Sequence, residues 1–395
     1  MKNCSNCLLP ETHETIAFDS KGTCNICTQH VFKEEKIDWE TKKEELKKLI
    51  SEYKGKYEYD CIIPFSGGKD STWALYYLIK EFKVNPLVVR FDHGFLRPNL
   101  EKNVKKVSRE LGFDMINFTP NWKIAQKLML KSFLDKGDFC WHCHTGIFSY
   151  PMWVAIEKKV PLVFWGEKSS EYTAYYSFDD AEEVNEERFN RYINLGITSE
   201  DMFLRLNGEI TLNQLKPFTY PNLEDLKALN YKSVCLGSYI PWNPKKQSQI
   251  IMQELGWKGD EVENVPPEYN YEKIECYMQG VRDYIKYIKR GYSRPSHLSA
   301  IDLRNKEISI DKAKENIKLY EGKKPPSLDI FLEFIGLKED EFYEVLKTHE
   351  ISPNKFDLEN IDNGKKVHDF DTWERSGKME REEALKIFKD WKKNN

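Results

Sequence analysis

The residues best suited to chemistry form a glycine- and serine-rich turn, SGGKDS, at 66–71. A short apolar run precedes the turn, and apolar residues at helical spacing follow it as far as Phe82. Adjacent glycines let backbone N–H groups approach an anion, serine hydroxyls add donors, and the following helix directs its positive end at the same place. The turn therefore predicts a phosphate-binding loop, although its spacing is not that of a Walker A loop. Its residues are Ser66, Gly67, Gly68, Lys69, Asp70 and Ser71.

Cysteines near the N-terminus form a second set with possible chemistry. Cys4 and Cys7 make one C-x-x-C pair and Cys24 and Cys27 another, with sixteen residues between the pairs. Each pair can place its thiolates on one turn, and two such turns complete a tetrahedral zinc site. The segment is otherwise short and polar, so the metal would supply its stability. The spacing predicts a small zinc ribbon, with iron or an unmetallated structural role as the alternative.

A further group of cysteines lies within the central part of the chain. Cys140 and Cys143 sit in the sequence FCWHCH before a predicted helix, and Cys235 lies close to Gly237 in a predicted strand. Three thiolates with one open position suit a [4Fe–4S] cluster. Alternatively, His142 or His144 could help to form a zinc site, and Cys235 could be an ordinary core cysteine.

From residue 57 the chain alternates between strands and helices. Predicted strands span 61–65, 85–92, 114–118, 161–165 and 234–239, and predicted helices cover 70–82, a stretch after 94, 121–134 and 145–159. Such alternation predicts a doubly wound, parallel α/β sheet that binds ligands at the carboxyl ends of its strands. Several polar or small residues lie at such ends: Asp92, His93, Gly166, Glu167, Gly237 and Ser238. We expect them to meet the phosphate-binding loop in one crevice.

The sequence divides into four regions. They are a zinc-ribbon-like module at 1–32, a helical linker at 33–56, an ATP-binding domain at 57–245 and a helical region at 246–395. No Gly/Ser-rich linker precedes the last region, so we expect it to pack on the sheet domain. Residues 168–232 are an acidic and aromatic insertion that includes Asp179 and Asp180, for which we expect helices or a lid.

One polar turn in the helical region also draws notice. It carries Arg290, Tyr292, Arg294 and His297, between a glycine and a proline. These side chains could contact phosphates or a sugar, and an ordinary surface loop is the alternative.

Composition narrows the class of protein. The 395 residues are 40% hydrophobic and 31% charged, which is typical of a soluble chain of two or three domains. The net charge of −4 gives no basic field that would favour nucleic acid as a partner. The N-terminal residues include no apolar leader, and no apolar run approaches the length of a membrane span. We therefore expect a cytoplasmic protein without a membrane partner, in which paired cysteines favour metal over disulfides.

The phosphate-binding loop resembles the PP-loop of ATP pyrophosphatases, which split ATP between its α and β phosphates. Nearly the whole chain resembles the N-acetyl sugar amidotransferase family of that superfamily. The resemblance is carried by the cysteine pairs and by FSGGKDS at 65–71, GEKSSEY at 166–172, LGSYIPWNPKKQ at 236–247 and GYSRPSHLSAIDLR at 291–304. The resemblance implies a PP-loop fold of the adenine nucleotide alpha-hydrolase type, with ATP and Mg²⁺ as cofactors beside Zn²⁺.

The resemblance also implies roles for individual residues. The loop residues, Lys69 included, would hold the β and γ phosphates, and Asp70 would bind Mg²⁺ or orient the loop. Asp92 and His93 would border the adenosine, with Gly166 and Gly237 beside the nucleotide. Glu167 and Glu171 would bind magnesium or guide ammonia. The implied catalytic set is therefore Lys69, Asp70, Glu167 and Glu171.

The implied reaction converts an acetamido group of a sugar to an acetamidino group. The enzyme would be an ATP-dependent C–N ligase that releases AMP and pyrophosphate, acting on a nucleotide- or carrier-linked N-acetyl sugar. Such enzymes serve bacterial surface-polysaccharide pathways, including lipopolysaccharide O-antigen and nonulosonic acids such as pseudaminic and legionaminic acid. The family resemblance implies that ammonia comes from a separate glutaminase, through a partner of the histidine-biosynthesis synthase type.

Two other functions compete with this one. The cysteine sets also look like those of PP-loop tRNA thiolases, which combine a zinc module with a three-cysteine iron–sulfur site. A thiolase should carry basic patches, whereas the net charge is −4 and the insertion is acidic. A non-catalytic nucleotide-binding scaffold is the third hypothesis, and the intact SGGKDS loop argues against it.

Overall fold

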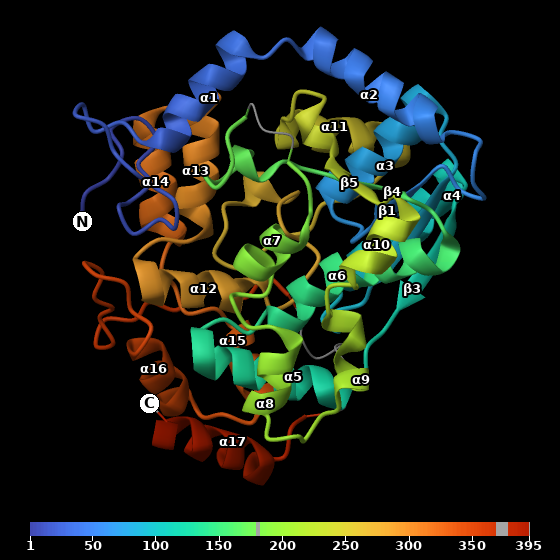
Figure 1. Cartoon of the computed structure of the whole chain (residues 1–395). Coiled ribbons are helices and arrows are strands. Elements are labelled where there is room, and N and C mark those ends of the chain that lie inside the picture. The colour runs from blue at the N-terminus through green and yellow to red at the C-terminus, as the bar shows by residue number, and fades with distance from the viewer. Residues whose placement is uncertain (179–181, 369–377, 395) are drawn as a thin grey trace.

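The computed structural model describes residues 1–178, 182–368 and 378–394. Five strands form one parallel sheet in the order β3-β2-β1-β4-β5 (Figure 1). They are β1 (Cys61–Pro64), β2 (Pro86–Phe91), β3 (Asp114–Phe118), β4 (Leu162–Trp165) and β5 (Lys232–Cys235). The chain runs from the centre to one edge and then crosses to the other side, so the order reverses between β1 and β4. This confirms the predicted doubly wound sheet, whose ligand site belongs at that reversal.

The last strand is shorter than the sequence predicts. It ends at Cys235, and residues 236–238 instead form the 3₁₀ turn η4 (Leu236–Ser238). The amide of Gly237 donates a hydrogen bond to the carbonyl of Gly166, 3.1 Å away. A Cβ atom on Gly237 would approach the backbone nitrogen of Lys168 to 2.9 Å, so the close approach of the two strand ends requires glycine here.

Helices cover both faces of the sheet, which explains why the strands are apolar throughout. On one face, side chains such as Ile63 and Val88 pack against α3 (Lys69–Phe82), α4 (Pro98–Leu111) and α11 (Pro244–Leu255). On the other, side chains such as Ile62 and Val89 pack against α6 (Trp141–Lys158). The alternation of neighbouring residues between these two cores is the ordinary consequence of strand geometry.

The helical C-terminal region shares a core with the sheet domain, as predicted. Its helices are α12 (Gln279–Arg290), α13 (Arg294–Arg304), α14 (Ile310–Tyr320), α15 (Ser327–Ile335), α16 (Glu339–Lys347) and α17 (Arg381–Asn394), preceded by the short turn η5 (Pro267–Tyr269). Side chains of α12, α15, α16 and α17 form one apolar cluster with α5 (Trp122–Lys136) and α6. Phe133 of α5, for example, stacks on Phe342 of α16 with ring centroids 5.2 Å apart.

The insertion at 168–232 consists of short helices, as expected, while Asp179 and Asp180 lie outside the described residues. The helices are η1 (Ser169–Glu171), α7 (Glu186–Arg188), η2 (Phe189–Ile193), α8 (Ser199–Arg205), α9 (Leu212–Leu215), η3 (Lys216–Phe218) and α10 (Leu223–Leu229). Phe189 and Ile193 are buried with the sheet, and Met202 and Phe218 with α5 and α6. The described part of the insertion is therefore built into the domain core.

The predicted linker helix is divided in two. It comprises α1 (Asn25–Lys36) and α2 (Trp39–Tyr53), and Asp38 caps α2 by accepting hydrogen bonds from the amides of Glu40 and Thr41. Both helices run along one end of the molecule, opposite α17 (Figure 1). Leu46 and Ile50 of α2 are buried against the sheet domain. Among the described helices, none is both long and apolar enough to cross a membrane.

Candidate functional site

A cavity of about 370 Å³ lies at the carboxyl ends of the strands. The walls on the sheet side come from the segments that follow β1, β2 and β4. The predicted residues that line it are Ser66, Asp70, Ser71, His93, Gly166 and Glu167. The crevice predicted from the strand ends is therefore present, and the phosphate-binding loop forms one side of it.

The loop itself is held by hydrogen bonds between its own residues. Ser66 Oγ lies 3.1 Å from Ser71 Oγ and accepts a hydrogen bond from the amide of Gly68 at 3.2 Å. Gly67 has φ +87°, where a side chain would be strained. A Cβ atom on Gly68 would collide with the carboxylate of Glu275. Each glycine of the pair is thus required for a different reason.

Lys69 is turned towards acidic residues and is not among those that line the cavity. Its Nζ atom lies 2.7 Å from Asp70 Oδ2 and 2.8 Å from Glu272 Oε1, and the side chain is buried. Burial opposes its charge, but Asp70 and Glu272 together raise the pKa of Lys69 above its usual value. Lys69 is therefore an ion-pair partner of Asp70 and Glu272, and the phosphate contact that the resemblance implies for it stays a prediction.

Asp70 and Glu167 face the cavity together. Asp70 Oδ1 is buried and makes no hydrogen bond with any described residue. Burial, and next the carboxylate of Asp70, raise the pKa of Glu167 above its usual value. Two neighbouring carboxylates, one with an unsatisfied oxygen, are the arrangement that a divalent cation with oxygen ligands would stabilise. These residues fit Mg²⁺.

Three other predicted site residues lie away from the cavity wall. Asp92 accepts hydrogen bonds from the amide of Gly94 at 2.8 Å and from Thr119 Oγ1 at 3.2 Å, so it shapes the loop after β2. Glu171 pairs with Lys33 Nζ of α1 at 2.8 Å. Gly237 joins the ends of β4 and β5. None of the three is among the cavity-lining residues of the described chain, and each supports the structure around it.

The wall facing the loop comes from a segment that the sequence did not single out. Residues 273–282 contribute Lys273, Glu275, Cys276, Met278, Gln279 and Arg282 to the cavity. Glu275 Oε1 lies 3.4 Å from Ser66 Oγ. The side chains of Lys273 and Arg282 make no hydrogen bond or ion pair with any residue that the structure describes. The segment follows no strand and contains no motif, so only its composition, NYEKIEC, could have drawn attention to it.

The backbone fixes this wall against the loop after β2. The amide of Tyr277 donates to the carbonyl of Phe95 at 2.9 Å, and Leu96 forms an isolated bridge with Cys276. The guanidinium of Arg97 donates from Nε to the carbonyl of Cys276 at 3.3 Å. Residues 95–97 and 276–277, nearly two hundred positions apart in the chain, are thereby held side by side at the cavity.

The four N-terminal cysteines are buried together, as predicted. Their sulfur atoms all lie within 4.8 Å of one another, with Cys4 and Cys27 3.9 Å apart and Cys7 and Cys24 3.7 Å apart. A tetrahedral zinc ion with Zn–S bonds of about 2.3 Å places its sulfurs about 3.8 Å apart. The cluster therefore fits zinc, and it could bind a metal without any rearrangement of its backbone.

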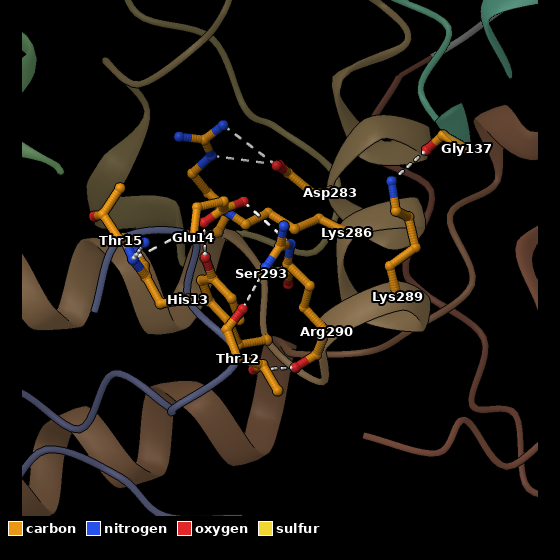
Figure 2. Close-up of polar contacts among 12 residues, drawn as sticks. Thr12, His13, Glu14, Thr15, Gly137, Asp283, Lys286, Lys289, Arg290 and Ser293 are labelled. Carbon is orange, nitrogen blue, oxygen red and sulfur yellow. Dashed lines mark hydrogen bonds and ion pairs between the residues drawn. The ribbon is translucent and has the colours of Figure 1, made fainter. Parts of the chain in front are cut away.

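The polar turn after α12 holds this module in place. Glu14 points towards Lys286 and Arg290 of α12 (Figure 2), at 3.5 and 3.3 Å, and accepts a hydrogen bond from Tyr292 Oη at 2.6 Å. Arg294 pairs with Asp283 at 3.3 Å. The remaining member of the turn, His297, is packed against the ring of Tyr172. Arg290, Tyr292, Arg294 and His297 thus contact other parts of the chain and are not among the residues that line the cavity, and the phosphate or sugar contact suggested for them stays a prediction.

The second set of cysteines lies at the cavity. Cys140, Cys143 and Cys235 all line it, and so does Cys276, which the sequence did not single out. In the described chain, no three potential metal donors at this cavity lie within 4.8 Å of one another. The imidazole Nε2 of His142 lies 3.4 Å from the carbonyl of His93, and His142 is not among the lining residues. A compact zinc site built on Cys140, Cys143 and a histidine is therefore not formed.

A doubly wound sheet, a glycine loop between β1 and α3, and carboxylates at the strand ends define an α/β domain of the class that binds ligands at the carboxyl ends of its strands. Residues 268–368 match a family model described as "LPS biosynthesis protein WbpG-like, C-terminal domain". The match includes the wall segment 273–282. The match covers about a quarter of the chain and, over those residues, supports the resemblance that the sequence indicates.

Two further likenesses come from Methanocaldococcus jannaschii. The chain is 32% identical over 117 residues to a protein described as "Uncharacterized protein MJ1599", covering 29% of this chain and 41% of that one. It thus spans less than half the length of that relative. A solved structure titled as a predicted subunit of tRNA methyltransferase is 16% identical, with a TM-score of 0.21, over 55% of this chain and 95% of that one. At that TM-score the likeness adds nothing to the description of the fold.

Proposed function

We propose that the protein is an ATP-dependent amidotransferase that acts on an N-acetyl sugar in surface-polysaccharide biosynthesis. One observation supports this above all. The phosphate-binding loop and the segment 273–282, which lies within the WbpG-like match, line the same cavity. A nucleotide on the loop would therefore face whatever acceptor the WbpG-like part selects.

In the proposed reaction, ATP converts the acetamido oxygen of the sugar into a good leaving group. An amide oxygen leaves poorly, so the acetamido oxygen first attacks the α phosphorus of ATP and pyrophosphate departs. Ammonia then adds to the activated carbon, and the C–O bond breaks to release AMP with the former amide oxygen. The sum is acetamido sugar, ATP and ammonia giving acetamidino sugar, AMP and pyrophosphate. Such a reaction asks the protein mainly for positioning and charge neutralisation.

The chain offers groups for each of these tasks. The amides of Gly67 and Gly68 and the hydroxyls of Ser66 and Ser71 would bind the phosphates that leave as pyrophosphate. Asp70 and Glu167 would hold Mg²⁺, which neutralises phosphate charge when bound. Lys69 would orient Asp70 through its 2.7 Å ion pair.

The opposite wall would select the acceptor. Lys273 and Arg282 are cations without hydrogen-bonded partners in the described chain, and both line the cavity. They would bind the anionic carrier of the sugar, such as a nucleotide diphosphate. His93 would border the adenosine. Glu171 is a weaker candidate for any catalytic role, because Lys33 already pairs with it.

The test uses the purified full-length chain with ATP, Mg²⁺ and ammonium. Candidate UDP- and CMP-linked N-acetyl sugars are added one at a time, and AMP, pyrophosphate and product mass are measured. The expected result is release of AMP and pyrophosphate that depends on one sugar, with a product lighter by the difference between O and NH. Glutamine should not replace ammonium unless a separate glutaminase partner is supplied, which also tests that proposed partner.

A tRNA thiolase is the second candidate function, and the cysteines at the cavity favour it. It would use the same adenylylation, with sulfur in place of ammonia. AMP release that depends on tRNA and not on any sugar would replace the amidotransferase proposal. Nucleotide binding without AMP release for either acceptor would favour a non-catalytic scaffold.

A further inference from the structure

The chain that follows β4, residues 166–174, lines the cavity on one side and contacts residues 1–36 on the other. We call these nine residues the joining segment. Its residues on the cavity side are Gly166, Glu167, Ser169 and Tyr172. Glu171 forms an ion pair with Lys33, and Ala174 forms a hydrogen bond with Thr15. The joining segment therefore connects the cavity wall to the part of the chain that holds the four N-terminal cysteines and α1.

The joining segment has little regular structure of its own. It contains the three-residue turn η1, and a single 3₁₀ turn is held by few hydrogen bonds. At the start of the segment, Lys168 Nζ donates to the carbonyl of Phe178 at 2.9 Å. The amide of Ser169 donates to the carboxylate of Glu182 at 2.7 Å. The insertion thus fixes the first half of the segment, and the half that begins at Glu171 depends on other contacts.

Lys33 of α1 makes the first of these contacts. Its side chain is buried, and its Nζ atom lies 2.8 Å from the carboxylate of Glu171. The same ammonium group donates to the carbonyl of Trp242 at 3.2 Å, in the loop that follows β5. Because β4 and β5 are neighbours in the sheet, Lys33 holds together the two segments that leave their carboxyl ends. Hydrogen bonds from a charged donor are stronger than those between neutral groups, so this contact fixes the segment firmly.

Thr15 makes the second contact. Its hydroxyl oxygen accepts a hydrogen bond from the amide of Ala174 at 2.9 Å. Its own carbonyl accepts from Nδ2 of Asn25, the first residue of α1, at 2.9 Å. Cys24 caps the same helix by accepting a hydrogen bond from the amide of Cys27. Both contacts on the joining segment thus come from the chain between the two cysteine pairs or from the helix that begins at the second pair.

We propose that Lys33 and Thr15 are positioning residues for the cavity. They fix the joining segment from the side opposite the cavity, so the order of the N-terminal cysteine region determines the position of the cavity wall. In the described chain neither residue is among those that line the cavity, so both act through Glu171 and Ala174. The positioning itself does not require a bound nucleotide, whereas its effect on the affinity for ATP rests on the proposed function.

The first test is hydrogen exchange of the full-length chain without ligand, measured by mass spectrometry on peptides that cover residues 166–174. Lys33→Met removes the charged contact and keeps most of the length of the side chain. It should raise the exchange rate of the joining segment about tenfold. Thr15→Val keeps the shape of the side chain and removes the acceptor for the Ala174 amide. It should raise the exchange rate by a smaller factor, because it frees a single neutral hydrogen bond.

Arg381→Met is the matched control. It breaks an ion pair with Glu341, whose side chain is 12% exposed against 11% for Glu171, and it lies on α17 at the opposite end of the molecule (Figure 1). It should leave the exchange of residues 166–174 unchanged. Thermal unfolding of all three variants checks that they fold. Unchanged exchange in both Lys33→Met and Thr15→Val would overturn the proposal, and so would an equal rise in the control.

The second test is titration with ATP and Mg²⁺ well below the unfolding temperature. The dissociation constant of Lys33→Met should rise about tenfold, while the control keeps the wild-type value. A loosened segment with unchanged affinity for ATP would show that Lys33 does not position the cavity. If the wild type binds no ATP, the proposed function fails, and the exchange of residues 166–174 decides this inference by itself.

Discussion

The two cysteine regions of this chain use the same C-x-x-C spacing and reach opposite geometries. At the N-terminus, two pairs close on one another with sulfurs 3.7 to 3.9 Å apart and no side open to the cavity. Cys140 precedes the long helix α6, Cys143 lies in its first turn, and both line the cavity without a second C-x-x-C pair beside them in the described chain. A closed set stabilises a fold, whereas an open set beside a cavity has a position left for a ligand.

The difference lies in what surrounds each pair. Leu8, at φ +65°, turns the chain back so that its amide donates to the carbonyl of Cys4, which forms a knuckle. After Cys140 the chain continues as α6, and the amide of His144 donates to the carbonyl of Cys140. Equal spacing in the sequence therefore does not predict equal function. The following predictions test this contrast, from the largest expected effect to the smallest.

Removal of the zinc ion that we expect at the N-terminal set should be the largest perturbation. Structural zinc contributes about 10–16 kcal/mol to the folding of isolated finger peptides. Here the docking on α12 and α13 would retain part of the structure, so we expect a loss of several kcal/mol in the free energy of unfolding. Chelation followed by calorimetric unfolding and metal analysis measures it, with Cys235→Ser as a variant that keeps its zinc. An unchanged unfolding midpoint after complete metal loss would show that the module does not depend on metal.

On the cavity side, Gly68→Ala should weaken ATP binding by about two orders of magnitude. The added methyl group collides with Glu275 and displaces either the loop or the facing wall. Titration calorimetry with ATP and Mg²⁺ gives the affinity. The double variant Gly68→Ala/Glu275→Ala should return towards the affinity of Glu275→Ala alone. If the double variant binds no better than Gly68→Ala, the collision is not the cause.

Breaking the ion pair between Lys33 of α1 and Glu171 of the insertion should have a smaller effect, measured on the free energy of unfolding. Lys33→Met leaves Glu171 buried without its partner. Burial already raises the pKa of this carboxyl, so it can take up a proton, and we expect a cost of about 2 kcal/mol, below the about 3–5 kcal/mol of a buried pair whose remaining member stays charged. Chemical denaturation measures the change. The exposed pair of Lys42 and Glu45 is the matched control, and Lys42→Met should cost no more than about 0.5 kcal/mol. Equal effects for the two variants would contradict the buried pairing.

Acid should weaken the contact between the N-terminal module and the turn after α12. Burial lowers the pKa of His13 to about 4 from its ordinary value near 6.5, so the folded state keeps a neutral ring that the unfolded state protonates. Stability is therefore complete above about pH 6.5 and is lost as the pH falls towards about 4, by roughly 1–3 kcal/mol. His13→Phe keeps a ring against Tyr292 and does not titrate. Its unfolding midpoint should fall less steeply across this range, and parallel slopes would rule His13 out.

Local signals explain what the sequence could predict. The SGGKDS loop, the strands and the C-x-x-C pairs can each be recognised from a few consecutive residues. The parallel, doubly wound sheet follows from the alternation of helices and strands. Glu275 and Cys276 were missed because they reach the cavity from about two hundred residues away, in a segment without periodicity, and so was Glu272, which pairs with Lys69. Glu171 and Arg290 show the opposite limit. Their charged side chains would suit a binding site, and only the folded chain shows that Glu171 forms an ion pair with Lys33 and Arg290 with Glu14.

The contact between Gly68 and Glu275 has a consequence for how the two halves of the cavity communicate. Glu275 lies against the phosphate-binding loop, so its carboxylate would be repelled by a triphosphate bound there, as the proposed function requires. Glu275 precedes Cys276 and lies on the same segment as Arg282. A displacement of Glu275 would therefore move the wall formed by residues 273–282, which we propose binds the acceptor. Thermodynamic reciprocity then requires that whatever occupies the wall alters the affinity for ATP by the same factor. The binding affinities for nucleotide and acceptor would then be coupled through the carboxylate of Glu275.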